Sequence, residues 1–477
     1  MPRILKSDLF ATLPPEWPTD PLLHIQELVK ADGRKVVVLD DDPTGTQTVY
    51  GVPVLTEWGV DALVAELSND LPCFYILTNS RAMPLSAAQA INTSIGQNLA
   101  QAMRIAKRDV ALMSRSDSTL RGHYPGEVDA LQQAVFGAAQ CPIILAPAFF
   151  AGGRYTIGDV HYVSDGMWLT PASETEFARD KAFGYTQSNL MAWVEEKTGG
   201  HAKAEDVVSI SIEDLREGGP DAVVRRLQQL LPSSVCIINA ASERDLAIAV
   251  ESLLLAERRG SRFVFRCAAS LVQMRAGIAP KPLLTRAFVL PSPVPTGEGL
   301  GARVGGLIIV GSYVPKTSGQ VAALLQTGVN NIAVNVGRLL DAATQQAEIN
   351  QATYQANTHL QRGEDVVIYT SRELIAGSDA ESSLAIGNRV SESLVAIVRG
   401  ISQRPRYILA KGGITSSDIA AKGLGVKRAM VLGQVLPGVP VWQLGPETKY
   451  PGTPYIVFPG NVGNETALAD VMTLLIA

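Results

Sequence analysis

Short apolar runs alternate with longer amphipathic segments along most of the chain, and this alternation restricts the fold more than any other feature of the sequence. The runs have the length and the β-branched content that are typical of buried strands, and the segments between them have helical spacing of apolar residues. Strands are expected over residues 36–39, 73–77, 110–113, 143–146, 207–210, 235–238 and 263–265. Helices are expected over residues 85–108, 125–137 and 246–258, among others. This order predicts an α/β fold with a mostly parallel sheet flanked by helices.

A stretch rich in Pro and Gly, residues 279–306, separates this series from a second one. The second series has expected strands over residues 307–310, 331–334, 366–369, 407–409, 429–431 and 455–458, and long helices over 342–361 and 382–399. We therefore predict an N-terminal arm over 1–30, a first domain over 31–280, a linker over 281–305 and a second domain over 306–477. Two lobes of this kind commonly place a ligand in the cleft between them, where we expect the active site.

Composition narrows the class of protein. A chain of 477 residues with 46% hydrophobic and 18% charged content is typical of a soluble enzyme with two or three domains. The net charge of −5 argues against a general nucleic-acid binder. The four cysteines are scattered and form no CxxC pair, so neither a zinc site nor a disulfide framework is indicated. The sequence shows no signal peptide and no membrane-spanning apolar run, and we expect a cytoplasmic protein without a membrane partner.

Three consecutive carboxylates, Asp40, Asp41 and Asp42, follow directly after the strand expected over residues 36–39. Adjacent carboxylates repel one another and lose hydration when they are buried, so folding alone gives no reason to place them there. In open α/β sheets the carboxyl ends of strands are where ligands bind. A solvated turn is the alternative, because Pro43, Thr44 and Gly45 are also ordinary turn residues. Three acids after a hydrophobic strand favour a functional site.

Polar and cationic residues also follow the next strands of the first series. They could converge on one rim and bind a small, oxygen-rich, anionic ligand, with Arg115 and Arg121 holding a carboxylate and hydroxyls such as that of Ser116 contacting a polyol. The alternative is a helix start with surface salt bridges. A lone His161 is more typical of a structural residue than of a catalytic one. The residues of this rim are Arg81, Arg115, Ser116, Asp117, Arg121 and Arg154.

The second series carries glycine-rich turns after three of its strands. Glycine lets backbone N–H groups approach a phosphate, and a helix that follows favours the negative charge. Glycine also ends strands for structural reasons alone, but three such turns in one lobe predict nucleotide phosphate binding. The candidate residues are Ser312, Lys411, Gly412, Gly413, Ile414, Thr415, Gly460, Asn461 and Gly463.

A competing interpretation starts from residues Asp40 to Thr44, which fit the DxDxT signature of haloacid-dehalogenase-type phosphatases. Asp40 would then be the nucleophile and Asp42 the acid/base, with Mg²⁺ between them. No matching acidic motif is clear later in the chain, and the glycine-rich turns would be left without a role.

Taken in order along the chain, these motifs resemble the four-carbon acid sugar kinase family, which includes 3-oxo-tetronate kinases and threonate or erythronate kinases. The motifs begin at Asp41, Asp117, Gly153, Gly311, Gly412 and Gly460. The resemblance implies a sugar-acid substrate-binding domain over 31–280 and a nucleotide-binding domain over 306–477. It also implies transfer of phosphate from ATP, with Mg²⁺ bound alongside the nucleotide, to the terminal hydroxyl of a tetronate.

Matched residue by residue, the family's ATP contacts would be Ser312, Gly412 to Thr415 and Gly460. Its substrate contacts would be Asp41, Asp42, Asp117 and Arg121, together with Arg81 and Arg154. The chain departs from the family where Asp40 replaces a common Ala, and where Pro459 stands in a final loop that commonly contains Lys-Ser-Gly.

These observations predict that Asp42 or Asp117 accepts the alcohol proton, while Lys411 and the glycine turns hold the phosphates. A phosphatase using Asp40 and Asp42 and a non-catalytic sugar-acid sensor stay as alternatives. The sequence leaves open which of Asp41, Asp42 and Asp117 is the base, which sugar acid is used, and whether the protein forms a homo-oligomer.

Overall fold

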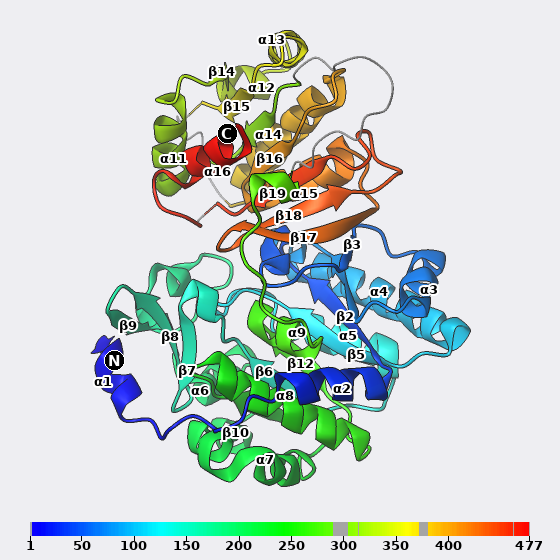
Figure 1. The fold of residues 1–477 in the computed structure, drawn as a ribbon, viewed down its shortest axis with the longest axis vertical. Helices are drawn as coiled ribbons and strands as arrows, with labels where there is room; N and C mark the ends of the chain where they lie inside the picture. Colours follow the sequence, from blue (N-terminus) through cyan, green and yellow to red (C-terminus); the bar gives the residue numbers. More distant parts are fainter. Residues whose placement is uncertain (1, 290–303, 313, 372–379, 461, 477) are drawn as a thin grey trace. The chain divides into compact units, whose positions relative to one another are not determined.

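The computed structural model describes residues 2–289, 304–312, 314–371, 380–460 and 462–476. The chain forms two compact units (Figure 1). Unit 1 consists of Met1–Val52 and Glu57–Pro280, and unit 2 of Pro53–Thr56 and Lys281–Ala477. Most of the predicted linker, residues 290–303, lies outside the described residues.

Unit 1 is built on a parallel sheet with the order β10-β11-β6-β12-β5-β2-β4. Its central strands are buried along their whole length, as their apolar sequences predict. All strands predicted for the first series form, and the mostly parallel α/β fold is confirmed. The strands are β2 (Lys35–Asp40), β4 (Cys73–Leu77), β5 (Val110–Arg115), β6 (Ile143–Ala146), β10 (Val208–Ile210), β11 (Val235–Ile238) and β12 (Val264–Cys267).

Helices flank this sheet, and the longest of them match the predicted amphipathic segments. Helix α8 begins with a capping box in which the Ser242 and Asp245 side chains satisfy the free N–H groups of the first turn. The helices are α1 (Lys6–Ala11), α2 (Leu22–Asp32), α3 (Val60–Ser68), α4 (Leu85–Ala106), α5 (Gly126–Phe136), α6 (Leu190–Lys197), α7 (Gly219–Leu227), α8 (Glu243–Arg258) and α9 (Ala269–Arg275).

Unit 1 also contains a small antiparallel sheet that the sequence reasoning did not predict. Its order is β1 (Ile4–Leu5), β9 (Trp168–Pro171), β8 (Val160–Asp165) and β7 (Arg154–Ile157). We call it the ribbon. Gly158 and Asp159, which join β7 to β8, both have positive φ, as a two-residue hairpin turn requires. Strand β1 belongs to the predicted N-terminal arm, so the start of the arm completes this sheet.

Unit 2 combines a parallel sheet with an antiparallel edge in the order β3-β17-β18-β19-β16-β13-β15-β14. The strands are β3 (Pro53–Leu55), β13 (Leu307–Val310), β14 (Asn330–Val334), β15 (Val366–Thr370), β16 (Ile408–Lys411), β17 (Arg428–Leu436), β18 (Val439–Leu444) and β19 (Pro454–Phe458). The helices are α10 (Arg286–Val289), α11 (Pro315–Leu325), α12 (Val336–Leu340), α13 (Gln345–Gln361), α14 (Ala380–Gly400), α15 (Gly413–Asp418) and α16 (Ala467–Ile476).

Strand β3 differs from the predicted division of the chain, which assigned residues 31–280 to one domain. Val54 pairs with Ala429 of β17, and the Thr56 amide donates to the Lys427 carbonyl at 3.0 Å. Three residues between turns carry too little periodicity to identify a strand, let alone its partner almost 400 positions away. No helix among the described residues is long and apolar enough to span a membrane.

Candidate functional site

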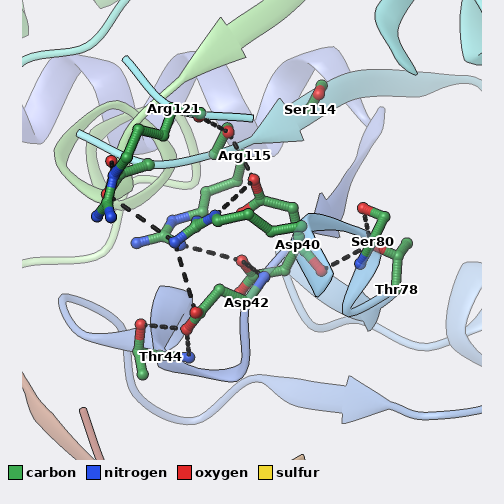
Figure 2. Close-up of polar contacts among 12 residues, drawn as sticks. Asp40, Asp42, Thr44, Thr78, Ser80, Ser114, Arg115 and Arg121 are labelled. Atoms are coloured by element: carbon green, nitrogen blue, oxygen red, sulfur yellow. Dashed lines mark hydrogen bonds and ion pairs between the residues drawn. The ribbon is translucent and has the colours of Figure 1, made fainter. Parts of the chain in front are cut away.

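The carboxyl ends of β2, β4, β5 and β12 in unit 1 carry a cluster of buried and half-buried charges (Figure 2). Parallel strands end at the same edge of the sheet, so residues that are distant in sequence meet there. The structure brings together Asp40 to Asp42 after β2, Arg81 after β4, and Arg115 to Arg121 at the end of β5.

Arg81 connects three carboxylates of the cluster. Its Nε and Nη2 atoms donate to the two carboxylate oxygens of Asp41 at 3.1 and 2.5 Å. Its Nη1 atom lies 3.4 Å from Asp42 Oδ2 and 3.9 Å from Asp117 Oδ1. A planar guanidinium is suited to such a role because it presents donors in several fixed directions.

Asp41 is buried and fully engaged. Besides Arg81, the Ser116 hydroxyl donates to its Oδ2 atom at 2.6 Å. Burial raises the pKa of the Asp41 carboxyl, but the charge and hydrogen bonds of Arg81 outweigh burial and hold the pKa below its usual value. Asp41 is therefore ionised and tied to protein groups.

Asp117 is held in a similar way, by its own loop. The Arg121 Nε atom donates to Asp117 Oδ2 at 2.7 Å, and the Thr119 hydroxyl donates to the same oxygen. Burial raises the pKa of Asp117, but the charges of Arg121 and Arg81 prevail and hold it well below the usual range. Arg121 also lies 3.6 Å from Asp180, so the arginine has carboxylate partners on two sides.

Asp42 is the most accessible carboxylate of the cluster. Its side chain is 20% exposed, compared with 13% for Asp117 and 3% for Asp41. The Thr44 amide and hydroxyl donate to its Oδ1 atom at 2.9 and 2.5 Å, which fixes the side chain at the start of the turn Pro43–Thr46. Within the described residues, the Oδ2 atom has a single contact, the long one to Arg81.

Asp40 lies beneath this cluster. Its carboxylate is 3% exposed and accepts a hydrogen bond from Arg115 at 3.1 Å, while its backbone carbonyl accepts from Thr78. Burial raises the pKa of Asp40 to about 7, against the effect of the Arg115 charge. Asp40 thus supports the loop from below.

The environment of Arg115 differs from the expectation that it clamps a substrate carboxylate. Its side chain is 5% exposed and pairs with Asp40, so its guanidinium is already engaged within the protein. Arg121, the other expected clamp, is paired with Asp117. The sequence contains Arg115, Arg121 and their acidic partners as separate residues, and only the folded loops show how they pair.

Arg154 is the exception among the predicted arginines. It forms no ion pair with any carboxylate in the described part of the chain, and its Nε atom is buried without a hydrogen-bond partner. Its Nη1 atom donates to the Gly152 carbonyl. The guanidinium groups of Arg121 and Arg154 lie 5.1 and 5.7 Å from the centre of the same Phe177 ring, so the two arginines are neighbours. Burial lowers the pKa of Arg154.

Arg266 in β12 is a member of the cluster that the sequence reasoning missed. It is 4% exposed, donates to Ser114 at 3.0 Å and lies 3.4 Å from Glu127. Its charge also contributes to the lowered pKa of Asp41. A side chain on Gly122, which has a φ of +118°, would overlap with Arg266 and Ser116. Arg266 stands within the otherwise apolar strand β12, directly after the expected strand 263–265, and this was the available signal.

In unit 2 the three predicted glycine turns converge. The Thr317 hydroxyl donates to the Gly460 carbonyl at 3.1 Å and lies 3.2 Å from the Ser312 hydroxyl. A side chain on Gly311 would overlap with Thr415, and one on Gly412 would contact Ser312. Gly412 has a φ of +115°, which other residues rarely adopt. Ile414 is 42% exposed beside these turns.

Two of the residues predicted to bind the nucleotide instead make contacts that stabilise the fold. Lys411 is fully buried, and its Nζ atom donates to the Pro459 carbonyl at 2.9 Å and lies over the Phe458 ring. Gly463 has a φ of +83° and packs against Ala467 at the start of α16, where a side chain would overlap. Asn461 lies outside the described residues. Gly413 is the first residue of α15.

The described residues contain no group of three or more His, Cys, Asp or Glu side chains arranged to hold a metal ion. The acidic cluster is paired with arginines instead.

Comparisons with known proteins also divide the chain into an N-terminal and a C-terminal part. Residues 36–275 match the family model of a sugar-binding N-terminal domain, and residues 307–468 match that of a nucleotide-binding C-terminal domain. No curated protein matches the sequence at a significant level.

Two solved structures share the fold. A Salmonella typhimurium LT2 protein, provisionally described as a tRNA synthase, is 17% identical, with a TM-score of 0.64 over 91% of this chain and 98% of that chain. The Haemophilus influenzae protein HI1011 is 15% identical, with a TM-score of 0.61 over 92% of this chain and 100% of that chain. With a sugar-binding model over half of its length and a nucleotide-binding model over residues 307–468, the chain belongs to the four-carbon acid sugar kinase family.

Proposed function

We propose that this protein is an ATP-dependent kinase that phosphorylates the terminal hydroxyl of a four-carbon sugar acid, such as a tetronate, 3-oxo-tetronate, threonate or erythronate. The observation that carries the proposal is the accessibility of the Asp42 carboxylate. It is the accessible carboxylate of a cluster in the sugar-binding domain, in a chain that also carries a nucleotide-binding domain.

Asp42 is the best candidate for the group that accepts the alcohol proton. A general base needs a lone pair that is free to meet the substrate, and both oxygens of Asp41 accept from Arg81, with a further hydrogen bond from Ser116. Asp117 accepts from Thr119 and Arg121 through Oδ2 alone, but its side chain is less exposed than that of Asp42. Asp42 Oδ2 has one long contact, and Thr44 holds the side chain through the other oxygen. The Asp42 side chain is therefore held in place by Thr44, and its Oδ2 atom is available to the substrate hydroxyl.

Arg154 is the best candidate for binding the substrate carboxylate. Arg81, Arg115, Arg121 and Arg266 each have a carboxylate partner within the protein, whereas Arg154 has none among the described residues. A buried guanidinium with an unpaired Nε–H gains most from an anionic ligand, because two parallel hydrogen bonds would satisfy it.

The converging glycine turns of unit 2 would receive the nucleotide. The backbone N–H group at Gly460 can approach a phosphate without side-chain interference, and the Ser312 hydroxyl lies beside it. The Gly412 N–H already donates to the Phe458 carbonyl at 2.9 Å, so the contribution of Gly412 is to let the chain pass close to Ser312. The exposed Ile414 could pack against the base. Mg²⁺ would neutralise phosphate charge when bound with the nucleotide, and such an ion needs few protein ligands because it keeps most of its waters.

The phosphatase interpretation requires Asp40 to attack a substrate. Asp40 is nearly inaccessible and paired with Arg115, so the geometry gives it no access to a phosphoryl group.

The proposal is tested by measuring ADP release with purified protein, Mg²⁺, ATP and a panel of four-carbon sugar acids. We expect turnover with at least one acid and a loss of about 10³-fold in kcat for Asp42→Asn, with binding of ATP unchanged. Asp180→Asn is the matched control and should retain most activity, because Asp180 lies 3.6 Å from Arg121 and otherwise accepts from the Ala182 and Phe183 amides through an oxygen that Asn keeps. Phosphate release from sugar phosphates without ATP would contradict the proposal.

A further inference from the structure

The loop from Asp117 to Gly122 has a backbone that needs outside support. Leu120 has a φ of +68°, in the left-handed region that residues with a side chain rarely occupy, and Gly122 has a φ of +118°. Such conformations persist only where the surroundings hold them, and they concentrate at functional sites. This loop carries both Asp117 and Arg121.

Two buried side chains from other segments hold consecutive carbonyls of the loop. His161 of β8 donates from Nε2 to the Ser118 carbonyl at 2.7 Å. Tyr185, from the segment between β9 and α6, donates its hydroxyl to the Thr119 carbonyl at 2.8 Å. His161 is fully buried and Tyr185 is 5% exposed, so water does not compete for either hydrogen bond.

The tautomer of His161 follows from its partners. A carbonyl only accepts, so Nε2 must carry the proton that points at Ser118. Burial lowers the pKa of His161 to about 4, and the ring is neutral at pH 7. Nδ1 then accepts from the Thr156 hydroxyl at 3.0 Å on the neighbouring strand β7. The hairpin β7–β8 thereby fixes both the orientation and the tautomer of the ring.

We infer that His161 and Tyr185 are positioning residues for the phosphoryl-transfer reaction, and that the segment between β6 and α6 serves to hold the Asp117 loop in its strained conformation. Through Asp117, which contacts both Arg121 and Arg81, the two hydrogen bonds also set the guanidinium that binds Asp41 and Asp42. Neither residue touches the reacting groups. This inference rests on the proposed function, because the effect is expected on turnover.

Tyr185→Phe tests the inference with the smallest change, since it removes one hydroxyl and leaves the ring in place. We expect kcat to fall about tenfold, with KM for ATP unchanged, because a shifted Asp117 loop misplaces the substrate site and not the nucleotide site. The matched control is Tyr155→Phe. The Tyr155 hydroxyl lies on β7 of the ribbon and accepts from Lys6, and its loss should leave kcat within twofold. Equal effects of the two variants would overturn the inference.

His161 offers a test by rescue. His161→Leu removes the donor to Ser118, whereas His161→Gln keeps an N–H near the position of Nε2. We expect His161→Leu to lower kcat at least tenfold and His161→Gln to recover most of it, while both remain folded by circular dichroism. Equal losses in the two variants would show that the hydrogen bond to Ser118 is not what matters.

Hydrogen exchange separates this inference from the proposed function. We expect faster amide exchange over residues 117–122 in Tyr185→Phe and in His161→Leu than in the wild-type protein, whether or not any sugar acid is turned over. If the wild type phosphorylates no acid but the exchange changes as expected, the proposed function fails and the support of the loop stands. Unchanged exchange in both variants would overturn the inference itself.

Discussion

The carboxylate of Asp40 fills the space beside Gly45 that a side chain at residue 45 would need. Gly45 lies in the turn Pro43–Thr46, directly above the end of β2, and an added Cβ would overlap with both carboxylate oxygens of Asp40. Asp40 also pairs with Arg115. The three residues form a buried support under the loop that carries Asp41 and Asp42.

Gly45→Ala should therefore damage both stability and activity. The methyl group can be accommodated only if the Asp40 carboxylate or the loop moves, and overpacking of this kind typically costs about 1–3 kcal/mol. We expect a lower denaturant midpoint and a fall in kcat. Gly387→Ala is the control, because an added Cβ there contacts nothing and residue 387 lies within α14. It should leave kcat unchanged and raise stability slightly. A neutral Gly45→Ala variant would show that the loop is not supported in this way.

Asp40→Asn distinguishes a supporting residue from a nucleophile. An amide retains the shape and one acceptor oxygen but removes the charge opposite Arg115, so we expect a stability loss of about 1–3 kcal/mol. Folded protein at low temperature should keep ATP-dependent turnover within tenfold of the wild type. Complete loss of ATP-dependent turnover in a variant that is folded by circular dichroism would show that Asp40 takes part in the reaction and is not a supporting residue alone.

The sequence predicted most strands of the two larger sheets, the two-part organisation and most residues of the acidic cluster, because each follows from a local pattern: an apolar run, or polar residues where such a run ends. Strand β18 (Val439–Leu444) was not predicted. The sequence could not predict which charged residues pair with each other. Arg115 and Arg121 are equivalent in the sequence, and only the fold buries the first against Asp40 and pairs the second with Asp117. Lys411 likewise predicts a phosphate ligand from its place in the sequence, but the fold buries it and its Nζ atom donates to the Pro459 carbonyl.

The ribbon and β3 were missed for a different reason. Their strands are two to six residues long, and their partners are set by tertiary contacts that a short pattern does not encode. His161 could be identified as structural from its isolation in the sequence, but its partner Ser118 lies 43 positions away.

Replacement of Arg154 should alter recognition of the acid group alone. We expect Arg154→Met to raise KM for the sugar acid about 10–100-fold, the usual effect of losing hydrogen bonds to a charged group. The kcat/KM for a neutral four-carbon polyol, assayed at high concentration, should change less than twofold, because the polyol has no carboxylate to lose. Arg154→Lys should be intermediate, since an ammonium keeps the charge but not the paired donors. An equal loss with acid and polyol would instead place Arg154 at the transferred phosphoryl group.

Lys411 predicts an unusual dependence of stability on pH. Burial, with a contribution from the charge of Lys316, lowers the pKa of Lys411 from 10.5 to about 7. Between these two values the unfolded chain binds more protons than the folded one, so stability should rise with pH. From pH 7 to pH 9 the gain is about 2 kcal/mol at most.

The effect of Lys411 is isolated by comparison with Lys411→Met, in which the same pH change should give no such gain. Chemical unfolding of both proteins at pH 7, 8 and 9 measures the difference. Parallel pH profiles for the two proteins would show that Lys411 keeps an ordinary pKa and that its ammonium is solvated.

Because β3 belongs to unit 2, two valines that are two positions apart in the sequence belong to different units. Val52 and Val54 are both buried, yet Val52 belongs to unit 1 and Val54 pairs with Ala429 in unit 2. Truncating either to Ala removes two buried methyl groups and should cost about 1–2 kcal/mol. Because each truncation acts on the unit that buries the side chain, Val54→Ala should speed amide exchange in β17, and Val52→Ala should speed it in β2. If instead both variants speed exchange in the same unit, residues 53–56 unfold with the sequence that surrounds them and β3 is not an integral strand of the nucleotide-binding domain.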